Sequence, residues 1–287
     1  KTVNTELWNG SAWTEVSNYP IATQDLGAWG TSTDSIAGAG YSTANTGLSA
    51  FWNGSAWTEV AEMATARNGV NRGGMGSDST AGIFAGGDSG SKTNVTEEWS
   101  APANFTQINL GQVYYNSGSN AFKVTGLSGA SGTWSSGGAL PQVMNQGTGC
   151  GIGNTSGMAM TGSSPPGSTV TSTAFQYDGT NWTEVAELNT AKSNASSAKN
   201  SPIATTLNYA GDGPGTYSKT NESWNNTSWT EEADLNVAGN AATGFGVSST
   251  SAGRAGGQST ATPPGGPHYT GTEIWNGSSW TEVNELL

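Results

Sequence analysis

Short runs of apolar and aromatic residues alternate along this chain with stretches rich in Gly, Ser, Thr and Asn. The segment Trp-Asn-Gly-Ser-Ala-Trp-Thr-Glu-Val spans residues 8–16, and near-identical copies lie at 52–60 and 275–283. An Asn-Gly pair between two aromatic, Thr-rich runs is a strong hairpin signal, because both central residues tolerate positive φ. No window shows a helical period bounded by capping residues. The pattern therefore predicts an all-β fold.

Looser copies of the hairpin follow at 177–185 and 224–231, and degenerate copies begin at Trp99 and near Trp134. The second aromatic of each copy recurs at positions 13, 57, 105, 134, 182, 229 and 280. Most of the intervals fit a period of roughly 40–50 residues, which is typical of four-stranded propeller blades. We expect the recurring aromatics to be structural wedges between blades. They are Trp8, Trp13, Trp52, Trp57, Trp99, Phe105, Trp134, Trp182, Trp224, Trp229, Trp275 and Trp280.

The segments before each hairpin supply the inner strands of the predicted blades. A short apolar run ending in Gly precedes the hairpins, as at 35–40 and 81–87, and a Gly-rich stretch such as 71–76 comes before it. Gly in a strand allows close approach of neighbouring chains, which a crowded propeller axis requires. One blade cannot bury both of its faces, but blades stacked around an axis bury them jointly. We therefore expect one propeller domain over residues 1–287.

The order of motifs within a repeat resembles the kelch family. The second repeat shows Arg67, then Gly86-Gly87, then Thr96-Glu97-Glu98-Trp99, then Phe105, and the last repeat ends in the same way. The pair of glycines is reduced to a single Gly in several repeats, and the hairpin is shorter than in typical kelch proteins. The resemblance covers nearly the whole chain. It implies a kelch-like β-propeller and says little about function.

A second resemblance is local. Residues 111–127 look like a hairpin found in bacteriophage tail-fibre and other virion proteins, and the repeated Trp-Asn-Gly hairpin is similar to kelch-like proteins of marine phages. This resemblance implies a place in a virus particle.

The count of blades depends on how the hairpins are grouped. We expect seven blade positions, the first of them incomplete, with a six-bladed ring as the alternative. The chain opens in the middle of a blade, so the missing inner strands are either upstream in a longer polypeptide or absent. The expected modules are a partial blade at 1–16 and blades at 17–60, 61–108, 109–137, 138–188, 189–235 and 236–287.

Composition and charge argue against several classes of function. The 287 residues include 43 Gly, 9 Lys and Arg, and 21 Asp and Glu, for a formal net charge of −12. Nucleic acid binding requires a basic footprint, which this balance opposes. It equally opposes binding to anionic membranes. No apolar stretch is long enough for a membrane span, so we expect no membrane insertion.

The sequence contains few residues of the types that catalysis usually requires. His268 is the only His, which excludes a multi-His metal site, and the single Cys150 is expected to pack as a small apolar group. Most carboxylates recur from repeat to repeat, and a residue used in every blade is structural, because an active site is used once. We expect no catalytic residues, no metal and no cofactor. The recurring carboxylates are Glu6, Glu97, Glu222 and Glu273 in one set, and Glu15, Glu59, Glu184, Glu231 and Glu282 in another.

The loops are the expected binding elements, because a rigid scaffold suits recognition through variable loops. The longest are 163–173, 211–219 and 258–270, and their candidate ligand-binding residues are Tyr217, His268 and Tyr269. The leading hypothesis is a non-enzymatic phage virion protein (tail fibre, appendage or capsid decoration) that binds host surface polysaccharide or another virion protein. The alternatives are a secreted or surface bacterial kelch-like adhesin or scaffold and, third, a carbohydrate-active enzyme. Expected locations are the virion or the cell exterior, and a homo-oligomer or a longer parent chain stays open.

Overall fold

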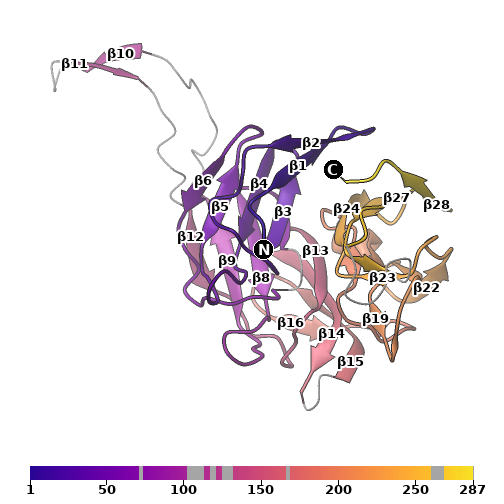
Figure 1. Cartoon of the computed structure of the whole chain (residues 1–287). Coiled ribbons are helices and arrows are strands. Elements are labelled where there is room, and N and C mark those ends of the chain that lie inside the picture. Colours follow the sequence, from indigo (N-terminus) through magenta and orange to yellow (C-terminus); the bar gives the residue numbers. More distant parts are fainter. Residues whose placement is uncertain are drawn as a thin grey trace.

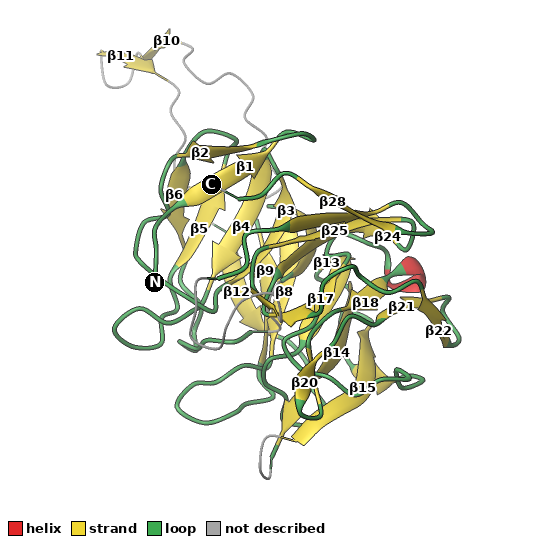
Figure 2. Cartoon of the chain, turned by 45° about the vertical axis from the view of Figure 1, so that its right-hand side comes forward, coloured by secondary structure: helices red, strands yellow, loops and turns green. Residues whose placement is uncertain are grey.

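The chain forms a β-propeller with five complete blades, arranged around an axis as Figure 1 shows. The structure, a computed structural model, describes residues 1–70, 74–101, 132–165, 169–259 and 268–286, together with the backbone of 113–116 and 121–124. Strands dominate these residues (Figure 2), and their one helical element is a 3₁₀ turn at Ile203–Thr205. Within this described part, no helix is long and apolar enough to cross a bilayer.

Each blade is a four-stranded antiparallel sheet whose strands follow one another outward from the axis. Blade 1 is β3 (Gly27–Thr31), β4 (Asp34–Gly38), β5 (Ser49–Trp52) and β6 (Trp57–Val60). Blade 2 is β7 (Met75–Asp78), β8 (Ala81–Ala85), β9 (Thr96–Ser100) and β12 (Thr133–Ser136). Blade 3 is β13 (Thr148–Gly153), β14 (Ser156–Ser164), β15 (Thr169–Tyr177) and β16 (Trp182–Glu184). Blade 4 is β17 (Ser196–Ser197), β18 (Leu207–Tyr209), β21 (Asn221–Trp224) and β22 (Trp229–Glu232). Blade 5 is β24 (Thr243–Ser248), β25 (Ser251–Ala255), β27 (Thr272–Trp275) and β28 (Trp280–Val283).

Four two-stranded sheets accompany the blades. One is the N-terminal hairpin of β1 (Thr5–Trp8) and β2 (Trp13–Val16), and another is the hairpin of β10 (Val113–Asn116) and β11 (Ala121–Val124). The other two lie at blade ends and pair β19 (Asp212–Gly213) with β20 (Thr216–Tyr217), and β23 (Gly239–Asn240) with β26 (Gln258–Ser259).

The predicted count of seven or six blades is wrong, because two predicted modules form one blade. β12 pairs with β9 in the register that places Trp134 opposite Trp99, as Trp57 lies opposite Trp52 in blade 1. The segments 61–108 and 109–137 thus share one sheet, and β10–β11 is an insertion between its last two strands. Phe105, expected as the second aromatic of this blade, lies outside the described residues.

The N-terminal hairpin sits between the last blade and the first. The Trp13 Nε1–H donates to Thr272 Oγ1 of blade 5 (3.1 Å), and the Trp57 Nε1–H of blade 1 donates to Thr5 Oγ1 of the hairpin (3.0 Å). The same contact recurs between complete blades, where Trp182 Nε1 donates to Thr96 Oγ1 at 3.1 Å. The hairpin therefore makes the same kind of contact with blades 5 and 1 that complete blades make with one another.

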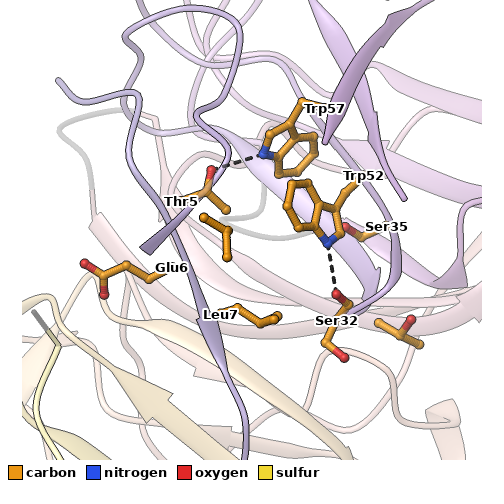
Figure 3. A pocket seen from close by; sticks show the side chains of 9 residues that line it. Thr5, Glu6, Leu7, Ser32, Ser35, Trp52 and Trp57 are labelled. Atoms are coloured by element: carbon orange, nitrogen blue, oxygen red, sulfur yellow. Dashed lines mark hydrogen bonds between the residues drawn. The ribbon is translucent and has the colours of Figure 1, made fainter. Parts of the chain in front are cut away.

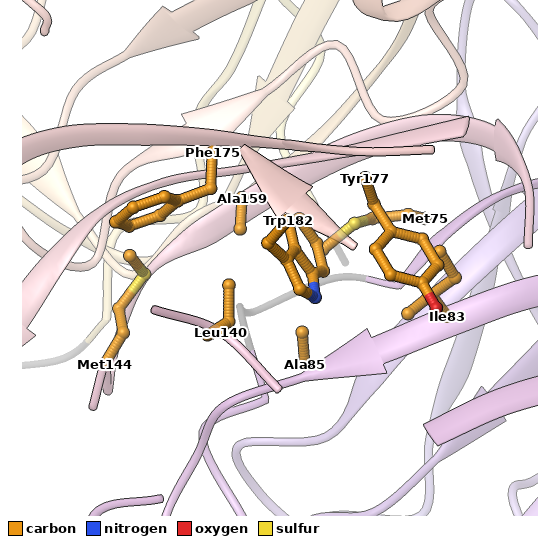
Figure 4. Close-up of a cluster of buried hydrophobic side chains, with 9 residues drawn as sticks. All are labelled: Met75, Ile83, Ala85, Leu140, Met144, Ala159, Phe175, Tyr177 and Trp182. Atoms are coloured by element: carbon orange, nitrogen blue, oxygen red, sulfur yellow. The ribbon is translucent and has the colours of Figure 1, made fainter. Parts of the chain in front are cut away.

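The core lies between neighbouring blades, as expected for a propeller. Figure 4 shows the cluster between blades 2 and 3, where Met75 and Ile83 face Phe175, Tyr177 and Trp182. The cross-strand aromatic pairs pack at ring-centroid distances of 4.8–5.5 Å. Burial of such large rings is the main favourable contribution that a chain poor in Leu and Val can make.

Glycine makes room for a neighbouring aromatic ring. Trp29, in the innermost strand of blade 1, is 3% exposed and packs against blade 2. A Cβ added at Gly74, Gly76 or Gly82 would lie within 2.4 Å of the Trp29 ring. The close approach predicted for these inner glycines is therefore made by a side chain of the next blade as well as by backbone.

The Trp-Asn-Gly hairpins have a turn that differs in detail from the prediction. Gly10 has φ +99°, but Asn9 does not adopt positive φ, and four residues separate Trp8 from Trp13. The Asn9 Oδ1 accepts the backbone N–H groups of Ser11 and Ala12 at 2.9 Å, which is the Asx-turn arrangement.

Candidate binding surface

The connections between the second and third strands of all five blades lie at one end of the ring, and we call this end the rim. It comprises 39–48, 86–95, 161–173, 210–220 and 256–271, as far as these are described. In blade 3 the ends of β14 and β15 form part of this range, beyond a shift in strand register between Met160 and Gly162. Two of the three longest loops noted in the sequence, 211–219 and 258–270, are therefore this connection in blades 4 and 5. The third, 163–173, is wrong as a loop, because β14 continues to Ser164 and β15 starts at Thr169. This topology places all of the predicted binding residues at one end of the molecule.

The rim begins in every blade with two residues in the left-handed region. The first has φ of 54–69° and the second, always Gly, has φ of 94–117°. Where the sequence has lost the first Gly, the conformation persists, because Ala39, Thr161 and Ala210 adopt it. The five pairs are Ala39-Gly40, Gly86-Gly87, Thr161-Gly162, Ala210-Gly211 and Gly256-Gly257.

A close backbone contact explains why the second residue is always Gly. A Cβ at Gly87 would lie 2.6 Å from the Asn68 carbonyl oxygen, and one at Gly257 would lie 2.4 Å from that of Asn240. Short bridges tie the same strands together, as between Asn68 and Asp88. The rim therefore starts from a fixed and repeated backbone, and its loops vary beyond that point.

Tyr217 and Tyr269 lie on neighbouring blades of the rim. The Tyr217 hydroxyl in β20 donates to Gln258 Oε1 of blade 5 at 3.0 Å; Tyr217 is partly exposed and Gln258 is exposed. The Tyr269 N–H donates to the Gly257 carbonyl (3.0 Å), and its ring lies 5.4 Å from the Arg254 guanidinium carbon. Tyr269 thus belongs to the connection 256–271, and Tyr217 contacts the same connection from blade 4.

The hydroxyl of Tyr269 is held by a carboxylate. It donates to Glu282 Oε1 at 2.9 Å, and burial together with Glu282 raises the pKa of Tyr269 above its ordinary value. His268, next to it in the chain, is exposed. His268 lies at the rim because it is adjacent to Tyr269 in the chain.

Sequence reasoning missed a third rim tyrosine. Tyr41 follows Ala39-Gly40 in blade 1, is partly exposed, and has the Lys1 ammonium 4.4 Å from its ring centroid. Its position directly after a degenerate pair of glycines was the available signal. Tyr41, Tyr217 and Tyr269 thus give the rim aromatic faces in three blades.

Beneath the rim, three of the recurring Glu residues, Glu97, Glu222 and Glu273, form buried ion pairs. The Arg67 Nη1 lies 2.9 Å from Glu97 Oε1, Lys192 Nζ lies 3.6 Å from Glu222 Oε1, and Arg254 Nε lies 3.5 Å from Glu273 Oε2. Glu97 also accepts the N–H groups of Ala64 and Thr65, and Glu222 accepts those of Asn189 and Thr190. These two carboxylates hold the chain that enters blades 2 and 4.

The cation of blade 5 comes from a different strand. Gly239 occupies the chain position that Arg67 and Lys192 hold in their blades, and Arg254 of β25 supplies the charge instead. A Cβ at Gly239 would lie 2.9 Å from Arg254 Nη1, so the guanidinium occupies the space that a longer side chain there would need.

Cys150, another candidate residue noted in the sequence, is packed in the protein interior. Cys150 lies in the innermost strand of blade 3 with no exposed surface, and burial raises the pKa of its thiol. Among the described residues, no group of three or more His, Cys, Asp and Glu side chains is placed to hold a metal ion.

An open cavity of about 160 Å³ lies between the N-terminal hairpin and blade 1 (Figure 3). Thr5, Glu6 and Leu7 of β1 line one side, and Trp52 and Trp57 line the other. The Trp52 Nε1–H donates to the Ser32 carbonyl at 2.9 Å. The cavity is large enough for a few water molecules, but small for a sugar or a drug-sized ligand.

Comparison with known proteins assigns no family: no family model matches the chain, and no curated protein sequence matches it.

Proposed function

We propose that this chain is a non-catalytic recognition protein that binds a host-surface polysaccharide through its rim. The observation that supports the proposal is the set of partly exposed tyrosines, Tyr41, Tyr217 and Tyr269, on connections that start from an invariant backbone. Tyrosine offers a flat apolar face and a polar hydroxyl, which suits stacking on sugar rings with hydrogen bonding at their edges. A rigid scaffold with variable loops lowers the ordering cost of binding.

We further propose that the propeller is kelch-like and belongs to a bacteriophage particle. The motif order around Arg67, Gly86-Gly87 and Thr96–Trp99 supports the kelch assignment, and the likeness of 111–127 to tail-fibre hairpins supports the virion. The net charge of −12 is compatible with neutral glycans and with basic protein neighbours in a particle.

The test is binding of the purified chain to the cell-surface polysaccharide of bacteria that a candidate phage infects. Tyr217→Ala combined with Tyr41→Ala should weaken binding by tenfold or more, while Tyr217→Phe, which retains the ring, should bind nearly as wild type. The variants should melt within a few degrees of the wild type, because both side chains are partly exposed. Binding by the double Ala variant equal to that of the wild type would reject the rim as the site.

A further inference from the structure

The residue that follows each pair of left-handed residues at the rim differs from blade to blade. It pairs with a residue just before or at the innermost strand of its blade, as Asp88 pairs with Asn68 and Asp212 pairs with Ser193. The backbone around these positions repeats, so a function that the molecule uses once is expected where the side chains break the repeat. The five residues are Tyr41, Asp88, Ser163, Asp212 and Gln258.

The Asp212 carboxylate joins two blades. The Asn194 Nδ2 of blade 4 donates to Asp212 Oδ2 at 2.7 Å, and the Asn240 Nδ2 of blade 5 donates to Asp212 Oδ1 and Oδ2 at 2.8 and 2.7 Å. Asn194 and Asn240 are buried, with exposed fractions of 7% and 6%, whereas Asp212 is partly exposed. The three side chains therefore form one group at the seam between blades 4 and 5, and solvent reaches this group at Asp212.

The charge of Asp212 is not balanced by a basic side chain. Among the described residues, no Lys or Arg forms an ion pair with it. The nearby Lys192 ammonium donates to Thr220 Oγ1 at 3.0 Å and lies 3.6 Å from Glu222, which uses its charge within blade 4. Asp212 differs in this from Glu222 and Glu273, which both have a cation, and its group has room for a positive charge from outside the chain.

Each of the two amides has an oxygen without a partner. The Oδ1 atoms of Asn194 and Asn240 are shielded from solvent and form no hydrogen bond among the described residues. Each of them is bonded to the same carbon as the nitrogen that contacts Asp212, so it lies close to the carboxylate. A shielded carbonyl oxygen without a partner is costly, and a bound ion or water is the usual explanation.

A half-turn of each amide brings these oxygens onto the carboxylate. The nitrogen and oxygen of an Asn amide have nearly the same shape and exchange places on rotation about χ2. After that rotation the Oδ1 atoms of Asn194 and Asn240 take the nitrogen positions, 2.7–2.8 Å from the Asp212 oxygens. Oxygen atoms at such distances repel one another unless a cation lies among them, and then all of them become ligands.

The ligand atoms indicate which cation fits. All of them are carboxylate or amide oxygens, which hard cations prefer, whereas zinc and copper favour His and Cys. Calcium takes six to eight oxygen ligands in flexible geometry, so three side chains and added water satisfy it. Magnesium requires a nearly ideal octahedron, which side chains from two different blades are less suited to provide.

We propose that Asp212, Asn194 and Asn240 bind a calcium ion at the seam between blades 4 and 5, with both asparagine oxygens turned toward the carboxylate. Water completes the coordination on the side where Asp212 is exposed. The ion joins the strand ends that carry Tyr217, which lies opposite Asp212, and Gln258, which lies opposite Asn240. The site replaces the expectation of no metal, and it does not depend on the proposed binding of a polysaccharide.

The test is titration of the purified, chelator-treated chain with calcium chloride in a calorimeter, without any glycan. The wild type should bind one ion with a dissociation constant of about 10⁻⁴–10⁻³ M, the range of weakly charged calcium sites, and magnesium should bind at least tenfold more weakly. Asp212→Ser should weaken calcium binding at least tenfold and still fold, because Ser163 holds the corresponding position in blade 3. Asp88→Ser is the matched control and should bind as the wild type does, since Asp88 Oδ1 accepts only the Gly90 N–H of its own loop.

A third variant distinguishes an ion site from a group held by hydrogen bonds alone. Asn240→Asp adds a second carboxylate at the position of the amide, so it should bind calcium more tightly than the wild type by threefold or more. Its melting temperature should fall without calcium, because two carboxylates then repel each other, and should recover when calcium is added. A wild type that binds no calcium up to about 10 mM overturns the proposal.

Calcium binding that survives Asp212→Ser places the ion elsewhere and also overturns the proposal. Magnesium binding as tight as that of calcium overturns the assignment to calcium. If Asn240→Asp binds calcium no more tightly than the wild type, the side chain at this position does not face the ion, and the proposed set of ligands is wrong.

Discussion

Arg67 and Glu97 form an ion pair in blade 2 at places that Met144 and Phe175 fill with apolar side chains in blade 3. The Arg67 Nη1 and Glu97 Oε1 are 2.9 Å apart with at most 3% side-chain exposure, and Met144 and Phe175 belong to the core cluster between blades 2 and 3. Arg67 precedes Asn68 and Met144 precedes Asn145, and both Asn residues form the bridge at the rim. The same scaffold position thus accepts a matched charge pair or a matched apolar pair.

Arg67→Met should therefore destabilise the protein more alone than in combination with Glu97→Phe. Removing one member of a buried pair leaves an uncompensated charge and costs about 3–5 kcal/mol, whereas replacing both members with apolar groups is often nearly neutral. Urea denaturation of the wild type, the two single variants and the double variant measures the coupling. If the losses in unfolding free energy of the two single variants simply add in the double variant, an apolar pair cannot replace the ion pair at these two positions.

The insertion in blade 2 should be removable. Replacing 100–133 by Asn-Gly-Ser-Ala joins Trp99 to Trp134 by the turn that joins Trp52 to Trp57, and the two pairs share one register. A roughly eightfold shorter connection costs about 2 kcal/mol less in closure entropy, so the free energy of unfolding should stay the same or rise. Chemical denaturation checks this, and a large loss of stability would mean that the insertion supports blade 2.

Gly87→Ala should destabilise more than Gly10→Ala. Both residues have φ near +100°, so both substitutions carry a similar backbone strain. The Cβ at Gly87 additionally meets the Asn68 carbonyl at 2.6 Å, whereas nothing lies within 4 Å of a Cβ at Gly10. We expect about 1 kcal/mol for Gly10→Ala and at least 2 kcal/mol for Gly87→Ala. Equal losses of stability in thermal denaturation would mean that the backbone at the rim moves enough to relieve the contact with the Asn68 carbonyl.

Lys192 should make the stability of the protein rise with pH in the alkaline range. Burial lowers its pKa to about 8, against the opposing attraction of Glu222, whereas the unfolded chain has a lysine pKa of about 10.4. Between these values the unfolded state binds more protons, so this group increases the free energy of unfolding as pH rises, by up to about 1.4 kcal/mol per pH unit. The gain is absent below about pH 8.

Lys192→Met is the reference for this measurement, because it removes the titrating group and retains a long side chain. The difference in unfolding free energy, wild type minus variant, should grow from about pH 8 to about pH 10.4. A difference that is constant with pH would show that Lys192 titrates as an exposed lysine.

The sequence predicted the blade architecture well because its signals are local. The Asn-Gly turn and its flanking Trp residues fix one hairpin per blade, and both ends of that hairpin lie within a few residues. The count failed where a blade is not contiguous, since the strand that pairs with β9 follows only after β10–β11. Spacing alone cannot distinguish a short blade from an insertion, because both displace the next aromatic.

The candidate site was predicted in part. Tyr217 and Tyr269 could be found because their loops are long, whereas Tyr41 is on a short connection that composition does not mark. The recurrence of Glu97, Glu222 and Glu273 correctly indicated a structural role, but their cations could not be assigned. Arg254 reaches Glu273 from a different strand, and only the three-dimensional arrangement shows that Gly239 leaves space for it.

The register of Trp99 and Trp134 has a practical consequence. The outer turn of blade 2 carries a long excursion, yet the strands on both sides of it pair as they do in blade 1. The outer turns of the remaining blades have the same Asx-type geometry and point to the same end of the ring, so foreign peptides grafted there would be displayed in a circle on a single chain. The spacing between such grafts would be set by the blades, which makes the molecule a platform for presenting several epitopes at fixed separations.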